Sequence, residues 1–152
     1  RDLRMSRGLG DVYKRQADEL AGYELFKKYD CATCHVGEIL GGQSYELIGV
    51  QHDYFADRAA EMTEEDNGRF KQTKIERDRH RFKVPGLRNV ELTYPYFHDG
   101  SMKTMDDAVR AMAKYQLGID LPQQEVDKIV SFLRTLTGQY KGQTLTNKNM
   151  SI

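Results

Sequence analysis

The sequence predicts an all-α domain in which long loops surround a small number of helices. Apolar residues recur at helical spacing once near the start of the chain and twice near its end. No stretch of useful length alternates apolar and polar residues, as a half-buried strand would. A five-residue cysteine and histidine motif, residues 31–35, follows directly after the first helical stretch. We therefore expect helices and loops arranged around a site at that motif.

Composition limits the function classes. At 152 residues, the chain has the size of one domain. Its 23 basic and 23 acidic residues balance, and there is no basic stripe of the kind that nucleic-acid binding requires. No apolar run approaches the roughly 20 residues of a membrane span. We expect neither a nucleic-acid-binding protein nor a membrane-spanning segment.

Residues 31–35 read Cys-Ala-Thr-Cys-His, the C-x-x-C-H spacing at which c-type haem is attached. The thiols of Cys31 and Cys34 are placed to add across the two vinyl groups of one haem c. His35 then meets the iron from one side. Because the chain has only these two cysteines, none is left over for a disulfide.

Two other chemistries use a C-x-x-C pair. Zinc would need further ligands, and the other histidines lack the H-x(3–5)-H spacing of zinc sites. These histidines are His52, His80 and His98. A thioredoxin-like dithiol should follow a strand, whereas a helix precedes this motif. The sequence therefore favours covalent haem over zinc binding or dithiol exchange.

The predicted domain begins at residue 17. Residues 17–29 form a helix whose apolar face delivers the motif at its C-terminal end. Residues 1–16 resemble a translated sequencing adapter, with five basic and two acidic residues and no hydrophobic periodicity. We expect a non-native leader there, with a disordered arm as the alternative. We see no secretory signal, yet haem attachment in bacteria is extracytoplasmic, so we expect a periplasmic protein whose native sequence extends upstream.

Long irregular segments follow the motif. Residues 37–49 are expected to form a loop, in which Gly41 and Gly42 allow close backbone approach. Residues 53–78 are highly charged and predict short helices and surface turns. Residues 82–95 contain two prolines and a glycine, which break regular structure. Their regularly placed apolar side chains indicate a segment wrapped over a core.

Two helices are predicted near the C-terminus. Thr104 is the N-cap of the first, with acidic residues in the first turn, and Gly118 ends it. Its apolar face comprises Met105, Ala108, Val109 and Met112. The second runs from about Pro122 to Leu136, and Gly138 closes it. Residues 139–152 are expected to be a polar tail that frays.

The iron of an electron-transferring haem usually has a sixth ligand, often a methionine thioether. Of the six methionines, three lie in the leader, the tail or a highly charged stretch. The remaining candidates are Met102, Met105 and Met112, with His98 as a rival. A methionine is more often core filler than a ligand. Residue pattern alone leaves these four candidates open.

Longer motifs add a resemblance. Residues 82–90 (FKVPGLRNV) and 92–100 (LTYPYFHDG) resemble the C-terminal domain of bacterial di-haem cytochrome c peroxidases. The other stretches similar to that domain are residues 25–28, 31–37, 41–43, 108–112, 116–118 and 132–138. The resemblance covers nearly all of residues 17–138 and implies a cytochrome c-like helical domain, with long loops around one covalent haem.

The resemblance also implies site residues. It identifies His35 and Met112 as the axial ligands of a high-potential, electron-transferring haem. Met105 then belongs to the core, and His98 is a hydrogen-bonded structural histidine near a domain interface. Calcium binding between two haem domains would use the backbone carbonyls of Thr93 and Pro95.

Contacts with the haem propionates are expected from Arg88 and Lys83. An arginine suits bidentate recognition of a carboxylate. The resemblance does not identify a catalytic residue in this chain, because the peroxide-cleaving haem belongs to the other domain of these enzymes.

The expected function is that of the electron-transfer domain in a peroxidase that reduces H2O2 to water. The expected partners are a small electron donor (a cytochrome c or a copper protein), an N-terminal domain with a second haem, and a second copy in a homodimer. The alternatives are a free-standing monohaem cytochrome c, a three-haem quinol-linked peroxidase, and a haem enzyme that modifies another protein.

Overall fold

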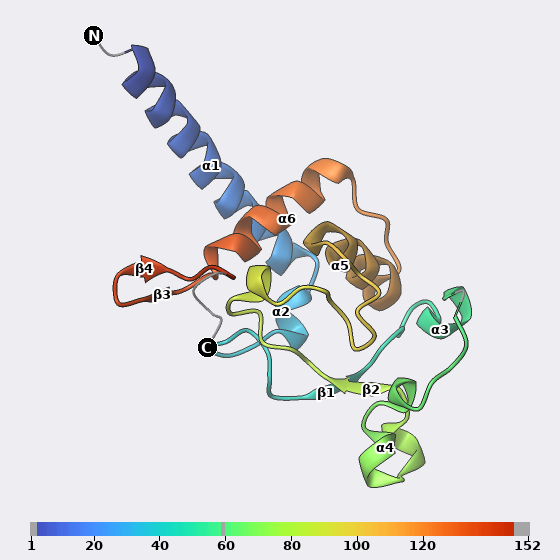
Figure 1. Cartoon of the computed structure of the whole chain (residues 1–152). Coiled ribbons are helices and arrows are strands. Elements are labelled where there is room, and N and C mark those ends of the chain that lie inside the picture. The colour runs from blue at the N-terminus through green and yellow to red at the C-terminus, as the bar shows by residue number, and fades with distance from the viewer. Residues whose placement is uncertain (1–2, 59, 148–152) are drawn as a thin grey trace.

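The computed structural model describes residues 3–58 and 60–147. Two helices, α1 (Leu3–Lys28) and α6 (Gln123–Thr135), cross at the centre of the molecule, and α5 (Met105–Met112) packs against α6 (Figure 1). Long loops and short elements extend from this helical core toward the opposite side. The predicted all-α fold with long loops is confirmed.

Helices α1 and α6 approach each other closely at Gly22. A Cβ atom at this position would lie 1.9 Å from the carbonyl oxygen of Lys128 and 2.9 Å from the Cβ of Phe132. A glycine inside a helix weakens it, so its presence here is explained by the backbone contact that it permits. The rings of Tyr23 and Phe26 then pack against Phe132, with centroids 5.3 and 5.4 Å away.

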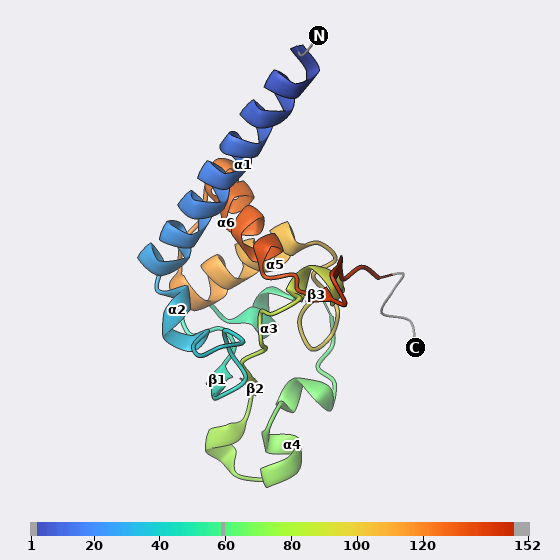
Figure 2. The same ribbon diagram turned by 90° about the vertical axis from the view of Figure 1, so that its left-hand side faces the viewer.

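Helix α1 is longer than predicted. Residues 3–16 continue it without a break, and Figures 1 and 2 show this part projecting beyond the other elements. The structure thus describes residues 3–16 as helix, and the expectation of a disordered arm stays untested. Extending an existing helix adds a hydrogen bond per residue and avoids the cost of a new nucleus. That residues 1–16 are non-native stays a prediction.

Helix α5 begins as predicted and ends differently. The hydroxyl of Thr104 accepts a hydrogen bond from the backbone N–H of Asp107, whose carboxylate accepts one from the Thr104 N–H. This capping box satisfies two backbone donors at the helix start. The α-helix ends at Met112, not at Gly118, because residues Ala113–Leu117 form a π-helical segment. Gly118 closes that segment with a left-handed backbone, φ 70°.

Helix α6 supplies much of the core. Pro122 is its N-cap and Leu136 its C-cap, within one residue of the predicted ends. Its inward face packs against α1 and α5. The buried core cluster comprises Phe26, Leu87, Met105, Ala113, Leu121, Val126, Ile129, Val130, Phe132 and Leu133. Met105 is thus a core residue, as predicted.

The charged segment after the motif forms short elements, as predicted. These elements are α3 (Tyr54–Asp57), the 3₁₀ turns Glu65–Asn67 and Glu76–Asp78, and α4 (Phe70–Thr73). The segment that was expected to be irregular includes a further 3₁₀ turn, Val90–Leu92. In Figure 1, α4 lies at the tip of a lobe far from α1.

Two short antiparallel strand pairings were not predicted. Strand β1 (Tyr45–Leu47) pairs antiparallel with β2 (Arg81–Lys83), with Glu46 opposite Phe82. Strands β3 (Gln139–Tyr140) and β4 (Gln143–Thr144) pair in the C-terminal segment, where fraying was expected. Strands of two or three residues are too short to show alternation in a sequence. Residues 148–152 of the predicted tail lie outside the described residues.

None of the helices among the described residues is both long and apolar enough to cross a bilayer.

Gly22→Ala is expected to destabilise the protein by about 1–3 kcal/mol, because the new methyl group meets backbone atoms of α6. Thermal unfolding followed by circular dichroism measures the change. Leu20→Ala is the control, since Leu20 lies on the same helix and is 62% exposed. Equal melting temperatures for wild type and Gly22→Ala would contradict the close crossing.

Candidate haem site

The motif forms a helical turn of its own, α2 (Cys31–Cys34), which packs against the end of α1. Asp30 turns the chain between the two helices with a left-handed backbone, φ 54°. Cys31 is half-buried and packs against the core, whereas Cys34 is exposed. One helical turn therefore presents both thiols, one toward the interior and one toward solvent.

His35 is held by its surroundings in a form suited to iron. Its Nδ1 lies 3.2 Å from the carbonyl oxygen of Leu40. Since a carbonyl only accepts, Nδ1 carries the proton, and Nε2 is left as the metal-binding nitrogen. Burial lowers the pKa of His35, partly offset by the carbonyls of Leu40 and Pro85, so the neutral imidazole is favoured. Neutral imidazole with a carbonyl partner is the usual metal-binding state of histidine.

The thiols are not activated for redox or zinc chemistry. Burial raises the pKa of Cys31 to about 11 and also raises the pKa of Cys34. Redox-active C-x-x-C pairs instead have a lowered thiol pKa, because the thiolate is the nucleophile and metal ligand. No group of three or more His, Cys, Asp or Glu side chains gathers as a metal site among the described residues. Neither thiol therefore has the lowered pKa on which dithiol exchange depends.

The residues around the motif fit a haem. Val36 and Ile39 follow it directly and are 38% and 49% exposed, so apolar surface lies beside the thiols. The ring of Phe26 lies 6.2 Å from the ring of His35, centroid to centroid. Within the described residues, α2 packs against α1, and α5 packs against α6. Apolar and aromatic side chains thus lie beside the thiols and the imidazole, as a haem would need.

Met112 is the last residue of α5 and is half-buried. Met105, on the same face of the helix, is 8% exposed and belongs to the core cluster. Met102 precedes the helix and forms a backbone bridge with Tyr96. Met105 is therefore engaged in packing, whereas the bridge of Met102 uses only its backbone, and the ligand role of Met112 stays a prediction.

The residues predicted to contact the haem propionates and calcium are exposed. Lys83 is at the end of β2, and Arg88 follows in the loop before Val90–Leu92. Thr93 and Pro95 lie just beyond that 3₁₀ turn and are also exposed. Propionate contacts and calcium binding at these positions stay predictions.

His98 has the surroundings of a structural histidine. Its Nε2 lies 2.7 Å from Oδ1 of Asp66, and its ring stacks on Phe82 with centroids 4.2 Å apart. The Asp66 carboxylate is fully buried and also accepts hydrogen bonds from the Thr63 backbone N–H and hydroxyl. Arg58 completes its shell.

Arg58 joins two carboxylates. Its Nη1 donates to Oδ1 of Asp66 and Oδ2 of Asp99, each at 2.9 Å, and its Nη2 lies 2.5 Å from Oδ2 of Asp66. The hydroxyl of Tyr54 donates to Asp99 as well. We call Tyr54, Arg58, Asp66, His98 and Asp99 the polar network. The sequence did not predict this network, because Arg58 and Asp66 stand among many charged residues of a segment expected at the surface.

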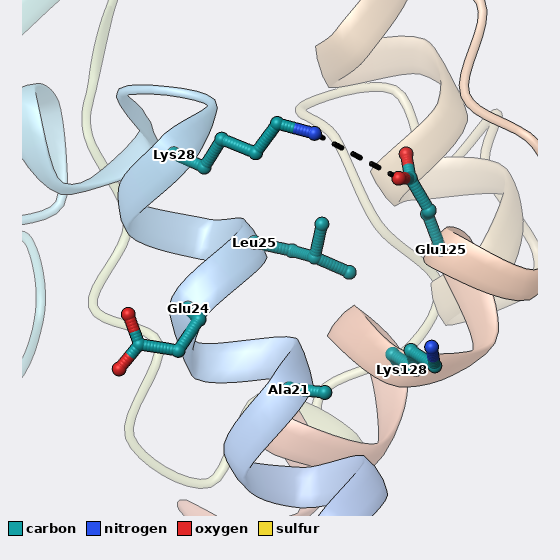
Figure 3. A pocket seen from close by; sticks show the side chains of 6 residues that line it. All are labelled: Ala21, Glu24, Leu25, Lys28, Glu125 and Lys128. Carbon is teal, nitrogen blue, oxygen red and sulfur yellow. Dashed lines mark ion pairs between the residues drawn. The ribbon is translucent and has the colours of Figure 1, made fainter.

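A hollow elsewhere on the surface lies between α1 and α6, as Figure 3 shows. It is lined by Ala21, Glu24, Leu25, Lys28, Glu125 and Lys128. The Lys28 ammonium and the Glu125 carboxylate lie 3.9 Å apart across it. It contains none of the predicted haem ligands, so it is separate from the candidate site.

Fold and motif together define a helical domain that binds a c-type haem. The family model for cytochrome c matches residues 20–137, and the chain belongs to the cytochrome c family. Membership implies covalently attached haem c, as the motif predicted.

Comparison with individual proteins shows which cytochromes c this chain is similar to. The chain is 52% identical over 131 residues to cytochrome c peroxidase Ccp of Escherichia coli K12, covering 86% of this chain and 28% of that protein. It is 48% identical over 129 residues to cytochrome c551 peroxidase of Nitrosomonas europaea, covering 85% of this chain and 37% of that protein. The relative from Pseudomonas aeruginosa is also named cytochrome c551 peroxidase. It is 38% identical over 130 residues, covering 86% of this chain and 37% of that protein.

A solved structure agrees with the fold. The crystal structure of a MauG-like protein associated with microbial copper homeostasis has a TM-score of 0.64 and 25% identity, covering 78% of this chain and 43% of that one. The predicted resemblance to bacterial cytochrome c peroxidases is confirmed. The chain spans between 28% and 37% of the length of the three peroxidases.

Asp66→Asn is expected to destabilise the protein by about 3–5 kcal/mol, because it leaves the Arg58 guanidinium buried without its main counter-charge. Hydrogen bonds from Arg58 hold the pKa of Asp66 well below its ordinary value, although burial opposes them. The ionised carboxylate therefore stabilises the fold above about pH 4 and is lost as a stabiliser as the pH falls further.

Denaturant unfolding between pH 7 and pH 3 measures both effects. The free-energy difference between wild type and Asp66→Asn should shrink toward pH 3. Asp120→Asn is the matched control, because Asp120 is exposed. A difference that stayed constant with pH would refute the role given to the carboxylate.

Proposed function

We propose that this chain is the electron-transferring haem domain of a di-haem cytochrome c peroxidase. The proposal rests on how much of the relatives' length the chain covers, together with how many haem-attachment motifs it contains. Nearly the whole chain aligns with peroxidases at 38–52% identity, yet it spans 28–37% of their length. It contains a single C-x-x-C-H motif, which accounts for one haem.

Haem c would supply one-electron iron redox chemistry at this site. Cys31 and Cys34 would hold the porphyrin, and the hydrogen bond from His35 Nδ1 to Leu40 fixes the orientation of the imidazole. A carbonyl partner raises the basicity of the other ring nitrogen, which strengthens it as a ligand. Met112 would offer a soft thioether, which favours ferrous iron and raises the potential.

Two protein ligands leave no open position for peroxide. The domain would therefore accept single electrons and pass them on, while excluding water from the iron. In the whole enzyme, H2O2 would take up two electrons and two protons and give two waters at the haem of the other domain. The electrons would come from a small cytochrome c or copper protein in the periplasm.

Three further features belong to the same proposal. The carbonyls of Thr93 and Pro95 would contribute to a calcium site shared with the second haem domain, since Ca²⁺ prefers oxygen ligands. Arg88 and Lys83 are exposed and cationic, which suits contacts with haem propionates. Two copies of the whole enzyme would form a homodimer.

A second function is favoured by one group of relatives. The chain is 26% identical over 148 residues to the methylamine utilization protein MauG of Methylorubrum extorquens, of which it covers 39%. A haem domain of an enzyme that modifies another protein would have the same fold. We rank this function second because the identity to MauG is lower than the identity to the peroxidases. A distal iron ligand other than methionine would favour it.

Met112→Ala is expected to abolish the weak far-red absorption band that ferric haem shows with a thioether ligand, and to lower the reduction potential. Absorption spectroscopy and redox titration of the haem-loaded chain measure both. Met102→Leu and Met105→Leu are the controls, because leucine conserves their volume without sulfur. Loss of the band in either control would move the ligand role to that residue.

The haem-loaded chain alone is expected to turn over H2O2 slowly, because both axial positions are filled. Steady-state peroxide consumption with a reduced small cytochrome c measures the rate, and Met112→Ala should increase it by opening one position. Rapid turnover by the wild-type chain with its thioether still bound would contradict the electron-transfer role.

A further inference from the structure

The chain just after Met112 is covered by a separate stretch, residues 47–58, which we call the strap. The carbonyl oxygen of Tyr115 accepts a hydrogen bond from the backbone N–H of Gln51 at 2.9 Å. The side chain of Gln116 donates to the carbonyl oxygen of Leu47 at 3.1 Å. Both acceptors are main-chain groups, so these bonds fix the path of the strap along the π-helical segment.

Side chains reinforce the contact. The ring of Tyr54 stands edge-on to the ring of Tyr115, with centroids 5.1 Å apart and planes at 86°. Tyr54 is 2% exposed, so this aromatic contact is shielded from water. The Lys114 ammonium forms an ion pair with Asp57 at 2.6 Å. Strap residues thus contact three consecutive residues that lie two to four positions beyond Met112.

The strap is itself anchored. Asp53 caps α3 by accepting hydrogen bonds from the N–H groups of Phe55 and Ala56. The Tyr54 hydroxyl donates to Asp99 at 2.9 Å, and Arg58 binds both carboxylates of the polar network. The end of the strap therefore rests on an ionised framework that includes the fully buried Asp66 carboxylate.

These contacts hold a π-helical turn, a rare element that is frequently found at functional sites. Here the turn starts directly after the half-buried Met112. Any opening of the turn would release the end of α5 and with it the thioether.

We propose that the strap positions Met112 on the iron, with Tyr54 as the positioning residue whose ring packs against the π-helical segment. This inference rests on the proposed ligand role of Met112. A methionine thioether is replaced by a stronger ligand only when it leaves the iron. The strap sets how often this happens, because it holds the turn that carries the methionine.

Imidazole binding to the ferric haem-loaded chain measures this opening. The apparent dissociation constant of imidazole equals its intrinsic value divided by the open fraction of the site. Loss of a buried aromatic pair should raise the open fraction by about two- to tenfold. Tyr54→Leu is therefore expected to bind imidazole about two- to tenfold more tightly than wild type, with the far-red band lost at lower imidazole concentration.

Tyr54→Phe separates the ring from the hydroxyl. It keeps the edge-on contact with Tyr115 but removes the hydrogen bond to Asp99, so imidazole affinity should stay within about twofold of wild type. Thermal unfolding is measured on both variants. A purely structural role for Tyr54 would lower the melting temperature without changing imidazole affinity below the transition.

Lys114→Gln is a second variant that leaves the buried residues intact. Removing its ion pair with Asp57 should raise imidazole affinity by about twofold at low salt and less at high salt. Lys71→Gln is the matched control, since it removes an exposed ion pair of similar length, 2.8 Å to Glu65, beside α4. Its imidazole affinity should equal that of wild type.

The outcomes distinguish the proposed ligand role of Met112 from the proposed role of the strap. A wild-type chain without the far-red band would overturn the ligand role of Met112 and the strap inference together. A wild-type band that Met112→Ala abolishes, with imidazole affinity unchanged in both Tyr54→Leu and Lys114→Gln, would overturn the strap inference alone. An equal effect of Lys71→Gln and Lys114→Gln would also overturn it.

Discussion

The contact between Gly22 and the carbonyl of Lys128 determines where the other functional elements lie. Helix α1 ends at the turn that leads to the cysteines, and α6 packs against both α1 and α5. The distance between the two ligand-bearing segments therefore depends on how closely α1 and α6 cross. A side chain at residue 22 would push the helices apart and displace His35 relative to Met112.

A second centre of stability lies far from this crossing. The polar network encloses a largely buried arginine and a fully buried carboxylate in the loop region, beside the aromatic rings of Phe55 and Phe82. Ionic groups at this depth are stabilising only when each is hydrogen-bonded, and Asp66 meets this condition with partners on both oxygens. The network thus gives the long loops a defined structure that their composition does not suggest.

Local signals in the sequence predicted the elements that depend on local chemistry. The capping box at Thr104, the stop at Gly118 and the final helix all follow from neighbouring residues, and the haem motif is set by five adjacent positions. The core role of Met105 and the hydrogen-bonded role of His98 were also predicted correctly.

Features that depend on distant partners were not predictable. Gly22 looks unfavourable in a helix until α6 is placed against it, and Asp66 resembles any solvated acid until Arg58 and His98 surround it. The π-helical segment was missed for the same reason, since the strap that supports it lies some sixty positions earlier in the chain. Sequence periodicity indicates one helix or strand at a time, whereas each of these features depends on a contact between two elements.

The π-helical segment also has a consequence for how the chain tolerates length changes. A π turn accommodates one more residue than an α turn, so deleting one residue between Ala113 and Leu117 would leave a continuous α-helix. The strap meets three consecutive residues within the segment, Lys114, Tyr115 and Gln116, so the deletion would remove one of these contacts. The helix would be more regular but less firmly attached to the strap, so the extra residue is what lets the end of this helix meet its neighbour at three successive positions.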